Sequence, residues 1–483
     1  MESVPPLPLP DETAVDYSLL GSGQAERGRK LFLTGLALLG VVLIYLTRNA
    51  NVQSLLHLYQ GLTIMTLSIV PSLIWARSGG SRFPVFEPIM GLCANAYGMP
   101  LLNGQEQLAA YAPDVVSRAG WVVIIYQLSG ILMYTAIRGQ PGRSRFWREP
   151  IVTQQIEKLI VYGLGASTLY VGISTFTTWI PSQYESALRA VFYGIGILST
   201  FVSTQRWGRG EMTQGEKALF LCTFVPQLIF MSVGLLLIGA FSLIGIALLG
   251  FLSGGKRIPW VFIALTFGSL AVLHTGKTRM REKYWEHNLP APTITELPAY
   301  FSEWVEFGLQ PTSGDKTVSQ KMIERTSLMH ILCLIAEYSP ARQDYLYGKT
   351  YGYVLPQLIP RVFWPDKPRS HIATYELAIY YGLQNEEDTN STTIAFGLLT
   401  EAYANFGLYG AIMLGMFWGF FLKKLQIWTT FSPMFSFAGL MMILLTAWSL
   451  SAELTMAAWV SSLEQALLVV IGLPMLIRSL LGH

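Results

Sequence analysis

Apolar runs of about twenty residues recur along most of the chain, separated by short polar segments. A bilayer core of ~30 Å is crossed by roughly that many apolar residues in one helix. The runs predict membrane spans at 31–47, 54–75, 84–102, 119–137, 159–180, 187–204, 218–236, 238–254, 258–274, 403–422, 434–450 and 464–481. The pattern therefore predicts an all-α polytopic membrane protein with about twelve transmembrane helices.

Two intervals of this pattern do not fit a single uninterrupted apolar span. The interval 84–102 is the weakest, because it contains Glu87, Asn95 and several prolines. The stretch from Ala218 to Ser253 is nearly uncharged and is too long for a single span. We therefore expect two helices there, joined by a tight turn.

Composition supports a membrane protein and narrows the partners. Hydrophobic residues make up 52% of the 483 positions and charged residues only 13%, against roughly 25% charged in soluble proteins. The net charge of +3 gives no reason to expect a nucleic acid. Cys93, Cys222 and Cys333 show no paired spacing, so neither a metal site nor a disulfide framework is expected. Residues 1–30 are polar and lack an apolar h-region, so no cleavable signal peptide is expected.

Lysine and arginine are unequally shared between the two sets of short loops. If the N-terminus is cytoplasmic, the loops on its side hold eighteen basic residues, and the opposite short loops hold only Arg48, Arg118 and Arg189. The positive-inside rule then predicts that both termini are cytoplasmic. The alternative, with the basic residues at 277–283 on the inner side, requires one more or one fewer span upstream.

One polar segment, 275–402, is far longer than the other loops, and parity places it outside the cytoplasm. The predicted organisation is a cytoplasmic tail at 1–30, transmembrane helices 1–9 at 31–274, a large extracytoplasmic loop at 275–402 and helices 10–12 at 403–483. Apolar residues at helical spacing predict amphipathic helices around 300–307 and over 318–338. Such helices either lie on the membrane surface or pack the loop against the bundle.

The densest part of the loop runs from Tyr347 to Arg369. Its four prolines, at positions 356, 360, 365 and 368, favour a rigid and mostly non-helical path. That path carries the cations Arg361, Lys367 and Arg369, with Phe363 and Trp364 between them. Fixed cations beside aromatic rings suit an anionic headgroup and a sugar. The alternative is a set of juxtamembrane anchors in an interfacial aromatic belt.

An acidic residue, Glu401, stands at the beginning of the tenth predicted span. A hydroxyl- and amide-rich run, Thr389 to Thr393, leads toward it. An acid at membrane depth is costly and points to a functional site. The alternative is an ordinary ion pair with an arginine of the loop.

These segments resemble the signature of the bacterial oligosaccharide repeat-unit polymerases, the Wzy-type O-antigen and exopolysaccharide polymerases. The resemblance is carried by Gly348-Lys-Thr-Tyr351, Ile359-Pro-Arg-Val-Phe-Trp-Pro-Asp-Lys-Pro368, Glu401-Ala-Tyr-Ala-Asn-Phe-Gly407 with Tyr409-Gly410, and the upstream Glu324-Arg325-Thr326. It covers roughly 324–410. One departure is Ser253-Gly-Gly-Lys-Arg257, where many relatives carry Ser-Arg-Gly, and this leaves the role of Arg257 open.

The resemblance implies a glycosyltransferase with a GT-C-like fold in the bacterial inner membrane. Such enzymes join undecaprenyl-diphosphate-linked oligosaccharides at the periplasmic face, without a metal or another cofactor. Membrane lipid is an expected partner, and the resemblance leaves room for a chain-length regulator. Fixed cations would stabilise the leaving diphosphate, and a base would activate the acceptor hydroxyl. The candidates for diphosphate and substrate binding are Arg361, Lys367 and Arg369, then Arg325, Lys349, Trp364 and Tyr351; the catalytic candidates are Glu401, then Asp366 and His371.

Three other functions share parts of this pattern. An O-antigen ligase has the same architecture and donor but a different acceptor, which the sequence does not identify. A lipid-linked oligosaccharide flippase or another transporter would be expected to show internal repeats with broken helices, and we find no repeat between the two halves. A structural scaffold of an envelope complex would tolerate charge changes in the loop.

Overall fold

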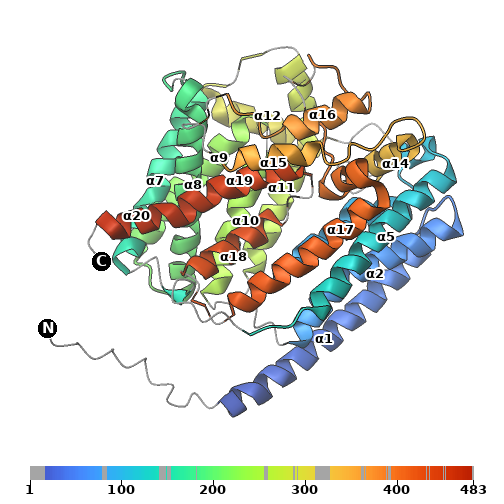
Figure 1. The fold of residues 1–483 in the computed structure, drawn as a ribbon. Coiled ribbons are helices and arrows are strands. Elements are labelled where there is room, and N and C mark those ends of the chain that lie inside the picture. Colours follow the sequence, from blue (N-terminus) through green and yellow to red (C-terminus); the bar gives the residue numbers. More distant parts are fainter. Residues whose placement is uncertain are drawn as a thin grey trace. The chain divides into compact units, whose positions relative to one another are not determined.

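The computed structural model describes most of the chain between residues 17 and 480. The positions outside the described part are 1–16, 79–83, 141–147, 150–153, 181, 236, 255–258, 287–288, 291, 311–326, 360–363, 365, 388, 390–392, 431, 434–435, 450, 452 and 481–483. Within the described part the regular elements are all helices, in agreement with the predicted all-α class (Figure 1).

Seven helices of the described residues are long and apolar enough to cross a membrane. They are Gly28–Arg48, Leu55–Arg77, Pro113–Ala136, Gln214–Val233, Trp260–Lys277, Leu398–Trp428 and Met456–Leu476. Shorter apolar helices cover Gly239–Phe251, Met329–Tyr338 and Phe437–Thr446. These helices agree with a membrane protein, while the number of spans stays a prediction.

The chain divides into two compact units. The first unit comprises Met1–Gly142, Met322–Thr430 and Trp448–Trp459. Its helices are α1 (Tyr17–Arg48), α2 (Leu55–Arg77), α3 (Phe86–Cys93), η1 (Ala94–Gly98), α4 (Met99–Leu102), η2 (Glu106–Ala110), α5 (Pro113–Ala136), α14 (Met329–Tyr338), η5 (Thr350–Tyr353), α15 (Val354–Gln357), α16 (Ile372–Tyr380) and α17 (Leu398–Trp428). The long helices α1, α2, α5 and α17 lie side by side in that order, with α2 against α5 and α5 against α17 (Figure 1).

The second unit comprises Arg143–Lys321, Phe431–Ala447 and Val460–His483. Its helices are α7 (Gln154–Phe176), α8 (Ser182–Arg209), α9 (Gln214–Val233), α10 (Leu237–Ser253), α11 (Trp260–Arg281), η3 (Glu282–Glu286), η4 (Ile294–Glu296), α12 (Leu297–Leu309), α18 (Phe437–Trp448), η7 (Leu468–Gly472) and α20 (Leu473–Leu480). The helix α19 (Met456–Leu467) starts in the first unit and continues into this one along the chain.

The two uncertain parts of the apolar pattern have clear structures. The weak interval 84–102 follows a helical path through α3, η1 and α4, and its π-helical middle covers Ala94–Gly98. Within that path the buried Glu87 accepts a hydrogen bond from the Tyr134 hydroxyl at 3.2 Å. The long uncharged stretch is confirmed as two helices, α9 and α10, separated by a turn in which Leu235 adopts φ +57°.

The amphipathic helix predicted around 300–307 is confirmed as α12 and is packed against α11. The Trp304 indole donates a hydrogen bond to the Leu273 carbonyl at 2.6 Å, and the Tyr300 hydroxyl donates to the Val233 carbonyl at 2.9 Å. Of the helix predicted over 318–338, the structure shows α14 from Met329 to Tyr338; Ser327 and Leu328 are not helical, and 318–326 lie outside the described residues. The first part of the loop therefore packs down on helices instead of extending freely.

Glycines let α5 and α17 pack backbone to backbone in the first unit. A Cβ atom added at Gly415 would collide with Ser129 and with the Tyr126 carbonyl, and one at Gly419 would collide with the Gly130 carbonyl. Two small residues four positions apart form the close-contact arrangement that holds helices together in membranes, where no hydrophobic effect drives them together. This contact fixes the direction of α17 and so the position of its first turns.

The substitution Gly415→Ala tests this contact. Forcing a methyl group into a filled helix contact costs about 1–3 kcal/mol, so we expect a lower melting temperature in detergent. Gly40→Ala in α1 is the matched control, because it changes a glycine of another apolar helix where nothing lies within 4 Å of the added Cβ. Equal melting temperatures for Gly415→Ala and Gly40→Ala would contradict the proposed packing.

Candidate functional site

The site begins at a break in α17. Gly407 has φ +59° and ψ −140°, which no helix allows, and the preceding cap Gly397 has φ +77°. Glycine is favoured at both positions because its backbone enters this region without steric cost. A Cβ at Gly407 would also lie 2.6 Å from the Tyr345 hydroxyl. The sequence Asn405-Phe-Gly407 therefore gives α17 a short first segment with its own direction.

The polar loop pairs with α17 next to this break. The backbone N–H of Leu346 donates to the Ala404 carbonyl, and that of Tyr347 donates to the Asn405 carbonyl, both at 3.0 Å. Irregular backbone at membrane depth is tolerated only where protein or water satisfies its polar groups. The loop segment 345–353 satisfies those groups here and is thereby held against the start of α17.

The side chain of Asn405 joins the loop to the helix. It is fully buried, and its amide nitrogen donates to the Thr350 hydroxyl and to the Glu401 carbonyl, each at 2.8 Å. Its amide oxygen accepts the N–H of Gly348 at 3.0 Å. Both donors and the acceptor are thus used. One residue of the motif Glu401–Gly407 therefore holds the motif Gly348–Tyr351 in place.

Glu401 lies one turn before Asn405 on the same side of α17 and is also fully buried. One of its carboxylate oxygens, Oε2, accepts the backbone N–H of Met456 at 2.6 Å, at the first residue of α19. The other, Oε1, has no hydrogen-bond partner among the described residues, and the Thr350 side chain lies close to the same carboxyl group. The partner of Glu401 is thus a helix N-terminus, which attracts a carboxylate.

An exposed ion pair lies on the loop segment 345–353. Lys349 forms an ion pair with Glu376 of α16, and the Lys349 side chain stays 62% exposed. The hydrogen bond to Glu376 raises the pKa of Lys349. Burial and the same carboxylate raise the pKa of Tyr353. The Lys349 ammonium is therefore charged at neutral pH and accessible to an anion.

The ring of Tyr351 packs on the face of Phe406, with the centroids 6.2 Å apart and the rings nearly parallel. Burial raises the pKa of the Tyr351 phenol above its usual range. This contact places Tyr351 beside the break in α17. The structure thus brings three predicted residues, Lys349, Tyr351 and Glu401, into one region.

Lys367 was predicted to bind an anionic group, but in the structure its ammonium is bonded to backbone carbonyls. Only 8% of it is exposed, and its ammonium donates to the carbonyls of Gln357 and Ile359 at 3.1 and 2.8 Å. These bonds fasten the end of α15 to the proline-rich path. In this structure Lys367 therefore holds the loop backbone, and the direct contact with diphosphate stays a prediction.

The other predicted residues of this path are more exposed. Trp364, Asp366 and Arg369 present their side chains to the outside. Arg361 and Arg325 lie outside the described residues. The described part of 364–370 is non-helical, as the prolines predict, although the preceding α15 forms one short helical turn.

His371 stands at the start of α16, three positions before Thr374. Burial lowers the pKa of its imidazole, so the ring is neutral at pH 7. One turn further, the hydroxyls of Thr374 and Thr455 are hydrogen-bonded at 3.1 Å. Thr455 directly precedes Met456, whose N–H binds Glu401. The start of α16 and the start of α19 therefore meet next to Glu401.

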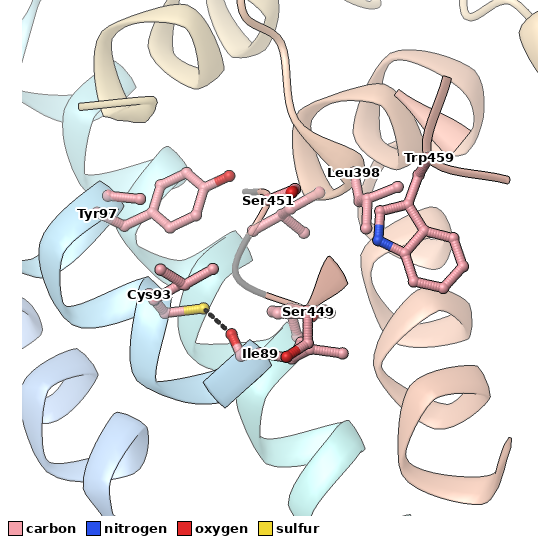
Figure 2. Close-up of a pocket in the computed structure, with 11 residues that line it drawn as sticks. Ile89, Cys93, Tyr97, Leu398, Ser449, Ser451 and Trp459 are labelled. Carbon is pink, nitrogen blue, oxygen red and sulfur yellow. Dashed lines mark hydrogen bonds between the residues drawn. The ribbon is translucent and has the colours of Figure 1, made fainter. Parts of the chain in front are cut away.

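A small cavity lies beside the first residues of α17 (Figure 2). It measures ≈ 50 Å³, and its lining residues are Ile89, Leu92, Cys93, Ala96, Tyr97, Tyr126, Leu398, Leu399, Ser449, Ser451 and Trp459. In Figure 2 the Tyr97 ring points toward the segment that carries Ser451. A buried water occupies at least ~10–15 Å³, so the cavity has room for a few waters. It is too small for a sugar.

Sequence reasoning missed three residues of this site. Asn405 lies four positions after Glu401, a spacing that puts both on one side of a helix, so its proximity to the carboxyl group could have been predicted. Thr350 and Glu376 are brought to the site by contacts between distant segments. A local sequence pattern does not predict contacts between distant segments.

Comparisons with known proteins place the chain in a family without an assigned activity. Residues 166–430, more than half of the chain, match the model of a domain of unknown function, DUF8712. The matched segment includes the loop 345–353, α16 and all of α17. No curated protein and no solved structure matches the chain. The chain belongs to the DUF8712 family.

Proposed function

We propose that this protein is a membrane glycosyltransferase that polymerises lipid-linked oligosaccharide repeat units. The observation that carries the proposal is the junction of Glu401 with the loop segment 345–353. There the buried carboxyl group of Glu401 begins one of the two segments that resemble the repeat-unit polymerases, and Asn405 of that segment binds the other. A scaffold has no need of a carboxyl group at this position, because burying an acid in apolar surroundings is costly.

The proposed reaction transfers the growing saccharide from its diphosphate carrier to a hydroxyl of the next unit. The acceptor oxygen bonds to the anomeric carbon, the bond from that carbon to the diphosphate oxygen breaks, and Glu401 takes the hydroxyl proton. Lys349, Arg369 and Arg361 are the proposed cations for the leaving diphosphate. Lys367 would support them through its hold on the loop.

Access to Glu401 requires a movement of the loop. The Thr350 segment covers the carboxyl group and is held there by Asn405. The acceptor hydroxyl reaches Glu401 only after this segment has shifted. The Asn405 hydrogen bonds would then define the closed state, and substrate binding would have to offset their loss.

The finer arrangement in the membrane belongs to the same proposal. Twelve spans with both termini in the cytoplasm would place 275–402 on the periplasmic side of a bacterial inner membrane, in a GT-C-like arrangement. The donor would be an undecaprenyl-diphosphate-linked oligosaccharide, and a chain-length regulator would be a partner. An O-antigen ligase is the second candidate, because it uses the same donor. A flippase would not need a buried base.

Glu401→Gln tests the proposed base. The glutamine oxygen can still accept the Met456 N–H, so the start of α19 is preserved, but the group no longer takes a proton. We expect normal expression and melting temperature and a fall in transfer rate of about 10²–10⁴-fold, the usual contribution of a general base. Glu453→Gln serves as the control, because Glu453 is an exposed carboxylate three positions before Met456. Wild-type polymer from Glu401→Gln would place the base elsewhere.

A charge exchange tests the role of Lys349. Lys349→Glu and Glu376→Lys should each break the ion pair and reduce polymer. If the pair is only structural, the double variant restores polymer, because the opposite charges meet again. If Lys349 binds the diphosphate, we expect the double variant to regain the wild-type melting temperature without regaining polymer. Polymer length on a gel and thermal melting together distinguish the two roles.

Deletion of the gene distinguishes the candidate functions. We expect single repeat units to accumulate on the cell surface, visible by gel analysis of the polysaccharide. Long polymer without its lipid anchor would identify a ligase. A complete absence of surface saccharide would identify a flippase, and either result would contradict the polymerase.

A further inference from the structure

Six tyrosines gather beside the loop junction, although the sequence spreads them over more than sixty positions. They are Tyr338, Tyr345, Tyr347, Tyr380, Tyr381 and Tyr403, and we call them the tyrosine cluster. Neighbouring rings meet edge to face, with centroids 5.2 to 6.5 Å apart. Edge-to-face packing leaves part of each ring face uncovered.

The cluster has a buried base and an accessible rim. Tyr381 and Tyr403 are buried, with 3% and 4% exposed, while Tyr338, Tyr345 and Tyr380 are partly exposed. Burial raises the pKa of Tyr381 to about 12, so this phenol stays neutral at physiological pH. The buried rings support the rim from below.

Hydrogen bonds fix the rim in one arrangement. The Tyr380 hydroxyl donates to the Asp344 carbonyl at 3.0 Å, and the Gln343 amide donates to the Tyr380 carbonyl at 2.7 Å. The hydroxyls of Ser339 and Tyr381 are hydrogen-bonded at 2.9 Å. Groups that are already ordered lose little entropy when a ligand binds. The rim is therefore prepared for binding before any ligand arrives.

Tyr347 is the most exposed member and has an unusual backbone. Its φ is +48°, in the left-handed region that non-glycine residues rarely adopt, and its side chain is 73% exposed. Its N–H is bonded to the Asn405 carbonyl, and Gly348 follows at φ +94°. Strained backbone of this kind persists where the surroundings fix it and is common at binding sites. Tyr347 therefore combines a constrained backbone with a ring that is open to a ligand.

The surroundings of the rim are polar. The Arg342 guanidinium lies over the Tyr338 ring, 5.1 Å from its centroid, and is paired with Glu337 at 3.3 Å. Gln343 and Asp344 lie between this pair and Tyr345 along the chain. Aromatic faces pack on the C–H faces of pyranose rings, and neighbouring carboxylate, amide and guanidinium groups bond the sugar hydroxyls. Lipid tails would offer no partners for these polar groups.

We propose that the tyrosine cluster is a saccharide-binding platform, on which Tyr347 and Tyr345 stack against the sugar rings of the chain that is being extended. The line Tyr347–Tyr345–Tyr403 leads from the exposed rim to the helix segment that carries Glu401. Saccharide binding follows from the cluster itself, and only the identity of the saccharide rests on the proposed function. The platform would hold the saccharide beside this helix segment, at Tyr403, two positions after Glu401 in the chain.

Tyr347→Asn is the decisive variant, because asparagine tolerates the left-handed backbone while the ring is lost. The probe is a set of short oligosaccharides released by mild acid from the host's own surface polysaccharide, free of lipid. Binding to the protein in nanodiscs is followed by saturation-transfer NMR. Loss of a stacked ring is worth about tenfold in affinity, so we expect Tyr347→Asn to bind about tenfold more weakly and Tyr347→Trp to bind at least as well as wild type.

Tyr409→Asn is the matched control, since Tyr409 is a 78% exposed tyrosine of α17 outside the cluster; its oligosaccharide affinity should not change. Unchanged binding in Tyr347→Asn overturns the platform. A second result would also overturn the platform. If spin-labelled lipids quench a fluorophore attached to the cysteine of Tyr347→Cys, the tyrosines contact lipid and form an interfacial belt. Tyr347-dependent binding by a protein that forms no polymer would keep the platform and overturn the glycosyl transfer.

Discussion

The buried amide of Asn405 is the contact on which the loop and the bundle both depend. It bonds Thr350, the Glu401 carbonyl and the Gly348 N–H at once, and it has no remaining polar atom to satisfy. Removing one partner of such a buried bond costs about 1–3 kcal/mol, because the other group stays desolvated. The Asn405 side chain therefore holds the segment that carries Lys349 and Tyr351, and its backbone carbonyl accepts the N–H of Tyr347. The proposed base, cations and saccharide platform are connected through it.

The break at Gly407 makes this contact feasible within a helix that is otherwise suited to cross a membrane. A continuous helix would satisfy its own carbonyls and offer the loop no partners. The break instead lets Ala404 and Asn405 accept N–H groups from Leu346 and Tyr347. Leaving a backbone polar group unpaired is costly in a bilayer, because there is no water to form the missing hydrogen bond. The loop thus satisfies the free carbonyls of α17, and the same hydrogen bonds hold the loop against the helix.

The sequence predicted the helices well, because apolar periodicity is a local signal; α9, α10 and α12 lie where the pattern indicates. It also indicated Glu401, since an isolated acid beside an apolar run is conspicuous. It did not reveal that the Lys367 ammonium bonds backbone carbonyls, because the charge of a residue says nothing about its long-range partners. The sequence did not predict the tyrosine cluster either. Its members come from α14, the loop, α16 and α17, and only the fold brings them together.

The most direct test of the account is transfer by the purified protein alone. The protein is reconstituted in liposomes with purified undecaprenyl-diphosphate-linked repeat units, and both released undecaprenyl diphosphate and saccharide length are measured. A polymerase releases one carrier for each new glycosidic bond, so we expect longer saccharides to appear over time and neither product to form with Glu401→Gln. Saccharides that stay at unit length, with no carrier released by the folded wild-type protein, would contradict it.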